Sequence, residues 1–193
     1  VFGSQDNFEQ FRVFSPTGRV PCLIDAQTAV WDSLAIVEYL AERHDGVWPS
    51  DATTRTYARC AAAEMHSGFS EIRNVCPMNC AITVEMGTIT PGLQRDIDRI
   101  DELWCEGLDR FGGPFLAGKK FSAADAFFCP VAYRVTGYQL PLSEPARKYA
   151  ELLMSMPAMR QWDASAIIEP WREQSHEDEA GAAGRIVLDR RTR

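Results

Sequence analysis

The sequence is poor in the residues that build metal and disulfide sites. Its 193 residues include three histidines and six cysteines, and no two cysteines form a Cys-x-x-Cys pair. The spacing of Cys76 and Cys80, with so few histidines, matches no zinc pattern. Most of the cysteines lie among apolar residues, as small core residues do in a reducing compartment. We therefore expect no metal site and a cytoplasmic protein.

The chain also lacks long hydrophobic runs, internal repeats and an excess of positive charge. A membrane helix needs about 20 consecutive apolar residues, and no stretch approaches that length. No signal peptide opens the chain, which carries little weight because the amino terminus reads as incomplete. The net charge of −7 and pI of about 5.0 argue against a nucleic-acid partner, which would need a clustered basic surface. We expect neither membrane nor nucleic-acid binding.

What is present is typical of a globular protein, with 46% hydrophobic and 24% charged residues. The first fifty residues have α/β character. Apolar runs at 20–25 and 28–31 predict two strands joined by a tight turn, and the apolar face of 32–43 predicts a helix. We expect a partial α/β domain at 1–44 and a linker at 45–52.

Only helical patterns follow from about Thr53. We expect one long helix that ends before Pro77, a second that opens at Thr90-Pro91 and stops at Gly112, and three more. These helices predict an all-α domain over 53–175. The charged tail at 176–193 is rich in glycine and alanine, so we expect it to be flexible.

Segment 15–21 has the sequence SPTGRVP, which puts a proline at the start of the first predicted strand. Proline cannot donate to a sheet ladder, so Val20–Pro21 is a special position. A cis bond would leave the backbone of Val20 free to pair with an extended peptide ligand. Because only about 5% of X–Pro bonds are cis, spacing alone favours an ordinary trans proline on an edge strand.

Asp32 and Ser33 open the predicted helix, with Ser33 as the expected cap. The N–H and hydroxyl of Ser33 suit a carboxylate at the helix amino terminus, and Asp32 suits an ammonium group. Together they fit an amino-acid head group that carries both charges. Without further context, an ordinary serine cap with an acidic neighbour is the simpler interpretation.

Two further motifs lie in the helical part. Ser122 and Asp125 have the spacing of a capping box, which favours a structural role at the start of a core helix. Segment 64–69, with the sequence EMHSGF, puts polar residues into an apolar helix face, and Arg73 follows. This segment is either a substrate wall or routine packing with His66 and Arg73 solvated, and the second interpretation is slightly favoured.

Taken in order, these motifs resemble those of the glutathione transferase superfamily. The matching runs are SPxGRVPxLID, VWDSLAIxEYLAE and FSxAD, and they extend from about Phe11 to Trp171. EMHSGF followed by PMN is similar to a bacterial branch of that superfamily. The resemblance implies an α/β thioredoxin-like amino-terminal domain, here partial, plus an all-α carboxy-terminal domain, in a protein that is usually a homodimer.

The resemblance also implies roles for particular residues. Val20 would pair through its backbone with the cysteinyl part of glutathione, and Pro21 would be cis. Ser33 would hold the γ-glutamyl carboxylate and Asp32 its ammonium group, through water because Asp is shorter than the usual Glu or Gln. Arg19 would reach the glycyl carboxylate.

Four more residues receive roles in this way. Phe69 and Arg73 would face the electrophilic second substrate, and Ser122 and Asp125 would be structural.

The chemistry implied is activation of the glutathione thiolate by a hydroxyl or thiol near the end of a first strand. The chain reads as beginning after that strand, so we expect roughly thirty preceding residues, the size of one βαβ unit. The catalytic residue would lie there, and we assign none. Cys22 is a poor substitute, because it should point into the core.

The sequence therefore predicts a transferase that conjugates glutathione, as its co-substrate, to small electrophiles, a detoxifying chemistry. Two alternatives stay open. One is a glutathione-dependent isomerase, and the other is a non-catalytic binding or interaction module of the same fold.

Overall fold

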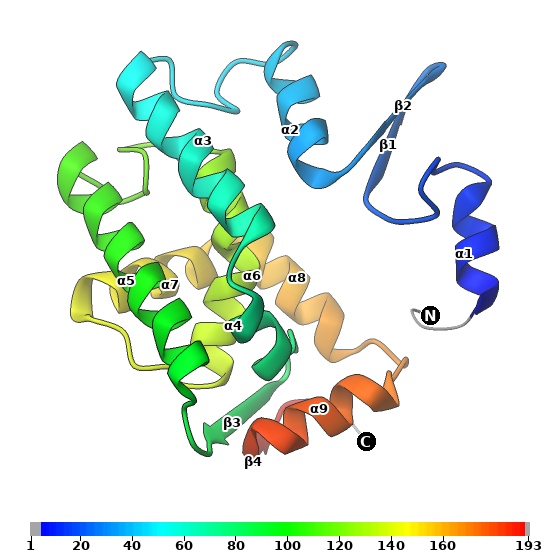
Figure 1. The fold of residues 1–193 in the computed structure, drawn as a ribbon, viewed down its shortest axis with the longest axis vertical. Coiled ribbons are helices and arrows are strands. Elements are labelled where there is room, and N and C mark those ends of the chain that lie inside the picture. Colours follow the sequence, from blue (N-terminus) through cyan, green and yellow to red (C-terminus); the bar gives the residue numbers. More distant parts are fainter. Residues whose placement is uncertain (1–4, 192–193) are drawn as a thin grey trace.

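The computed structural model describes residues 5–191. Its amino-terminal part holds a short helix, a hairpin and a second helix: α1 (Gln5–Arg12), β1 (Cys22–Asp25), β2 (Thr28–Trp31) and α2 (Ser33–Ala41). In Figure 1, α2 lies between the hairpin and the helices that follow it in the chain. The sequence patterns did not predict α1.

The hairpin forms where the alternation of apolar residues predicts it. Cys22 pairs with Trp31 and Asp25 with Thr28 in an antiparallel register, and Ala26 turns the chain at a φ of 53°. The first strand starts at Cys22 rather than Val20, because Pro21 has no N–H to donate to the ladder. The Tyr39 hydroxyl of α2 donates to Asp25 at 2.7 Å and ties the helix to the turn.

The helical part contains the helices α3 (Ala52–Ser67), α4 (Ser70–Val75), α5 (Pro91–Phe111), α6 (Ala123–Gly137), α7 (Glu144–Ser155) and α8 (Pro157–Ile167), with a short strand between α4 and α5. The sequence predicts one long helix where α3 and α4 lie, and this prediction is wrong. The chain leaves the helical path at Gly68, and Phe69 adopts a φ of 55° before α4 begins. A side chain at Gly68 would meet the Glu64 carbonyl oxygen at 2.8 Å, so glycine permits the break.

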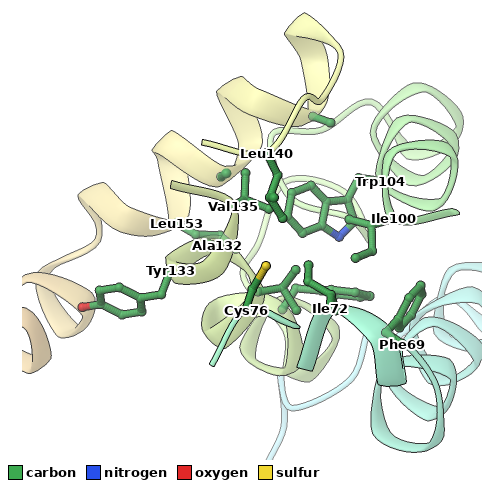
Figure 2. Packing of buried hydrophobic residues seen from close by; sticks show 14 of the residues in the cluster. Phe69, Ile72, Cys76, Ile100, Trp104, Ala132, Tyr133, Val135, Leu140 and Leu153 are labelled. Carbon is green, nitrogen blue, oxygen red and sulfur yellow. The ribbon is translucent and has the colours of Figure 1, made fainter. Parts of the chain in front are cut away.

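The core of this part is built around Trp104 of α5. Its ring makes edge contacts with Phe128, at 5.6 Å between centroids, and with Tyr149, at 4.9 Å. Figure 2 shows Trp104 beside Ile100 of its own helix, with Ile72 and Cys76 approaching from α4 and the start of the following segment. Fully burying side chains of this size contributes about 1.5–3 kcal/mol each, so this cluster fixes the helices against one another.

The carboxy-terminal part differs from the expected flexible tail. Residues after α8 form a helix, α9 (Gln174–Ala183), and a strand, β4 (Gly184–Asp189). That strand pairs antiparallel with β3 (Ile82–Met86), so the carboxy-terminal part is not purely helical. Arg191 pairs with Glu177 of α9 at 2.8 Å, and Ala180 is buried, which holds the tail against the body.

Candidate functional site

The open end of the β1–β2 hairpin brings two of the predicted motifs together. Cys22, which directly follows Pro21, pairs with Trp31, which directly precedes Asp32, so both motifs lie at this end of the hairpin. The Val20–Pro21 bond is cis, as the resemblance implies. Val20 is 43% exposed and lies outside the ladder of β1.

Arg19 is held at this end by the loop before it. The Ser15 side chain is fully buried, and its hydroxyl donates to the Arg19 carbonyl oxygen at 2.6 Å. Gly18 turns the chain at a φ of 64°, and a side chain there would meet the ring of Phe8 at 2.5 Å. These contacts position the backbone of Arg19 while its exposed side chain stays available for an anion.

Asp32, and not Ser33, is the residue that caps α2. Its Oδ1 accepts from the Leu34 N–H at 2.9 Å, which makes Ser33 the first helical residue. The expectation that Ser33 caps the helix is therefore wrong. Asp32 has a φ of 74°, a backbone conformation that costs a non-glycine residue about 1–3 kcal/mol. Such strain persists only where its surroundings impose it, and it is concentrated at functional sites.

His66 reaches this cap from α3, and sequence reasoning missed this contact. Its Nε2 lies 3.2 Å from Asp32 Oδ2, and its Nδ1 lies 3.4 Å from the Ser33 hydroxyl. The edge of the ring meets Phe127 of α6 at 6.2 Å between centroids. His66 is therefore not the solvated residue that the sequence favours, but a bridge between the helical part and the start of α2.

The start of α2 can hold both charges of an amino-acid head group. Ser33 offers a hydroxyl and an N–H at the positive end of the helix, where the first backbone amides have no intrahelical acceptor. Asp32 offers a carboxylate whose side chain is 45% exposed. A ligand carboxylate and a ligand ammonium group thus find opposite partners on adjacent residues.

The two residues predicted to face a second substrate lie in different surroundings. Phe69 is 7% exposed and belongs to the core cluster, where Figure 2 shows it near Ile72 and Ile100. Arg73 is exposed and donates to the carbonyl oxygens of Met65 and His66. The structure thus gives Phe69 a packing role and leaves Arg73 on the surface, bonded to the backbone at the end of α3.

Ser122 and Asp125 form the capping box that their spacing predicts. Asp125 is fully buried and accepts from the Ser122 N–H at 2.8 Å, the Leu116 N–H at 3.0 Å and the Tyr149 hydroxyl at 2.8 Å. Burial raises the pKa of Tyr149 well above its usual value, so its hydroxyl stays a donor. This network joins α6, α7 and the loop before α6.

The buried cysteines are unsuited to nucleophilic chemistry. Burial raises the pKa of the Cys76 thiol to about 12 and that of Cys129 to about 11, so both stay protonated near neutral pH. Cys22 is half-buried, and its thiol donates to the Phe14 carbonyl oxygen at 3.5 Å.

Within residues 5–191, none of the helices combines the length and the apolar character that a membrane span requires. Nor do His, Cys, Asp and Glu side chains from this range gather in a group of three or more that would suit a metal ion.

Comparisons with known proteins agree with the fold and with the motifs at the hairpin. The family described as "Glutathione S-transferase, N-terminal domain" matches residues 2–48. A probable maleylacetoacetate isomerase from Vibrio cholerae is 24% identical over 167 residues, which cover 82% of this chain and 77% of that protein.

Solved structures resemble the whole arrangement. A glutathione S-transferase from Rhodospirillum rubrum superposes with a TM-score of 0.62 at 20% identity, over 89% of this chain and 82% of that one. A glutathione transferase homolog from Burkholderia, with bound glutathione, gives a TM-score of 0.57 at 23% identity over 78% and 74% of the two chains. The fold is therefore a thioredoxin-like amino-terminal part joined to a helical carboxy-terminal part, as in these glutathione transferases, and residues 2–48 are similar to the amino-terminal domain of that family.

Proposed function

We propose that this protein binds glutathione at the open end of the hairpin and conjugates it to small electrophiles. The observation that carries the proposal is the pair of opposite partners at the start of α2. Ser33 presents a hydroxyl and an amide to a carboxylate, and Asp32 presents a carboxylate to an ammonium group. The γ-glutamyl end of glutathione carries both of these charges on one carbon.

We call Asp32 and Ser33 the anchor. The positions of the cysteinyl and glycyl parts of glutathione follow from the γ-glutamyl end bound there. An extended tripeptide that starts at Ser33 runs past Val20, whose backbone lies outside the β1 ladder and pairs with the cysteinyl residue. Arg19, one residue further along, supplies a cation for the glycyl carboxylate. Asp32 Oδ2 also contacts His66 Nε2, so this oxygen is shared between His66 and the ammonium group of the ligand.

Conjugation forms a bond between the glutathione sulfur and an electrophilic carbon while a leaving group departs with its electron pair. The protein contributes by holding the tripeptide and by stabilising the thiolate. We assign thiolate activation to none of the described residues.

A second candidate is glutathione-dependent isomerisation, which the name of the Vibrio cholerae relative favours. In that chemistry the thiolate adds to a cis double bond, the bond rotates, and elimination returns glutathione unchanged. The same anchor serves both reactions, so the two differ in the second substrate. Arg73 is exposed, bonds to the backbone of His66 and suits a substrate with a carboxylate, whereas the buried Phe69 does not line an open surface.

We also propose that the protein acts in the cytoplasm as a homodimer, as the resemblance implies. A non-catalytic binding module would keep the anchor and lack turnover.

The test is calorimetry with glutathione, followed by assays with two kinds of second substrate. Glutathione should bind, and an aryl halide should be conjugated with stoichiometric loss of free thiol. Isomerisation of maleylacetoacetate without loss of thiol would favour the isomerase instead. Binding without turnover of either substrate would leave the binding module, and no binding at all would contradict the proposal.

A further inference from the structure

His66 stands between the helical part and the proposed glutathione anchor, and its two ring nitrogens contact both anchor residues. Nε2 lies 3.2 Å from Asp32 Oδ2, and Nδ1 lies 3.4 Å from the Ser33 hydroxyl. The inference developed from this contact rests on the proposed function, since it concerns how the anchor binds the γ-glutamyl carboxylate.

The partners of a neutral imidazole fix which nitrogen carries its proton. The Asp32 carboxylate only accepts hydrogen bonds, so Nε2 must donate to it. Nδ1 is then the bare nitrogen and accepts from the Ser33 hydroxyl. In this state the hydroxyl proton of Ser33 points at His66 and is not offered to a ligand.

Protonation of the ring reverses the second of these bonds. Both nitrogens of an imidazolium donate, so Nδ1–H donates to the Ser33 oxygen while Nε2–H keeps its bond to Asp32. The Ser33 hydroxyl proton is then free to donate to a carboxylate.

The groups that surround the His66 ring leave its protonation as the main change that pH makes at Asp32 and Ser33. From α2, Asp32 is the charged side chain in contact with the ring. From α4, Arg73 donates to the His66 carbonyl oxygen and not to the ring. From α6 the neighbour is Phe127. Glu64, on the same helix as His66, is engaged by Arg99 at 2.7 Å.

The geometry points to His66 as a positioning residue that couples binding of the γ-glutamyl carboxylate to proton uptake on its imidazole. The ligand binds more tightly to the protonated state, and by linkage the bound carboxylate increases the affinity of His66 for its proton. Glutathione affinity should therefore rise as the pH falls from about 8 to about 6.

The test is calorimetry of the full chain with S-methylglutathione, which has the same γ-glutamyl end but no thiol that could release a proton. Titrations in two buffers of different ionisation enthalpy measure the protons taken up. Wild-type protein should take up a fraction of a proton near neutral pH and bind several-fold more tightly at about pH 6 than at about pH 8.

His66→Gln is the informative variant, because an amide can replace both hydrogen bonds of neutral histidine but cannot be protonated. It should bind with no proton uptake and with a flat pH profile. His44→Gln, at an exposed histidine just after α2, should keep the wild-type profile. A His66→Gln variant that retains the uptake and the pH dependence overturns the inference while the proposed function stands. Wild-type protein that fails to bind at any pH overturns both.

Discussion

Two aspartates stand at the starts of two helices, Asp32 at α2 and Asp125 at α6, and their surroundings differ. Asp125 is fully buried and accepts hydrogen bonds from the Leu116 N–H and the Tyr149 hydroxyl in addition to the N–H and hydroxyl of Ser122. Asp32 is half-exposed, holds a backbone conformation that favours glycine, and keeps part of its carboxylate toward the surface. One residue type thus stabilises the fold where the chain fills its hydrogen-bonding capacity, and suits the proposed binding role where capacity remains.

The helices that these residues begin differ in the same way. Over its whole length, Ser33–Ala41, α2 has no fully buried residue, whereas α6 buries nine. Changes at α6 should therefore cost stability, and changes at the start of α2 should cost affinity with little loss of stability.

The largest expected effect is the loss of stability in Asp125→Ala. Removal of the carboxylate leaves the N–H groups of Leu116 and Ser122 and the Tyr149 hydroxyl buried without an acceptor. Each such group costs about 1–3 kcal/mol, so the free energy of unfolding should fall by about 3 kcal/mol or more. Urea unfolding measures the change. Asp32→Ala serves as the matched control, and equal losses in the two variants would break the comparison.

The next effect is the loss of glutathione affinity in Ser33→Ala. The variant removes a hydroxyl that donates to a charged carboxylate, which is worth about 1.4 kcal/mol or about ten-fold in the dissociation constant. Calorimetry measures the affinity. Ser67→Ala is the control, because the Ser67 hydroxyl donates to the Ala63 carbonyl oxygen within α3 and lies away from the anchor. Unchanged affinity in Ser33→Ala would place the head group elsewhere.

Asp32→Asn should have a smaller effect on affinity. The half-exposed carboxylate is screened by water, so its attraction for an ammonium group is worth roughly two- to five-fold in affinity. A glutathione analogue without the amino group should bind wild-type protein and Asp32→Asn equally well. A loss of affinity for this analogue equal to the loss for glutathione would mean that Asp32 acts through the fold of the anchor and not on the ammonium group.

The smallest expected effect concerns the carboxy-terminal strand and depends on pH. Hydrogen bonds from Arg191 lower the pKa of Asp189 to about 2. A lowered pKa contributes stability above the unfolded value, and this contribution is lost as the pH falls toward about 2. Because Asp189 is 42% exposed, we expect about 0.5 kcal/mol at most.

The comparison of wild-type protein with Asp189→Asn in urea unfolding checks this contribution. The difference should shrink between about pH 5 and about pH 3. Asp178→Asn on α9 is the control. If the difference in the free energy of unfolding between the two proteins stays constant with pH, the Asp189–Arg191 pair does not contribute to stability.

Local signals in the sequence predict much of the fold. The hairpin follows from alternation around a turn, α5 from Thr90-Pro91 at one end and Gly112 at the other, and the α6 cap from the spacing of Ser122 and Asp125. Each signal lies within a few residues of the element that it predicts. Asp32 and Ser33, which we propose as the glutathione anchor, are marked by an equally local signal, although the cap is Asp32 and not Ser33 as expected.

The missed features all depend on residues far apart in the chain. Strands β3 and β4 are five and six residues long, and neither carries enough apolar pattern to outweigh the helical signals around it. They are stable because they pair across about a hundred residues, as Glu85 and Arg185 do. His66 meets Asp32 only once α3 packs beside α2, and Phe69 becomes buried only after Gly68 breaks the helix. A pattern that spans only a few residues of sequence cannot predict such contacts.

A crystal structure of the full chain with bound glutathione tests the central claim most directly. The account predicts the γ-glutamyl carboxylate within hydrogen-bonding distance of the Ser33 amide and hydroxyl, with the ammonium group at Asp32 and the cysteinyl backbone paired with Val20. A tripeptide bound in the opposite direction, or bound away from the start of α2, would contradict it.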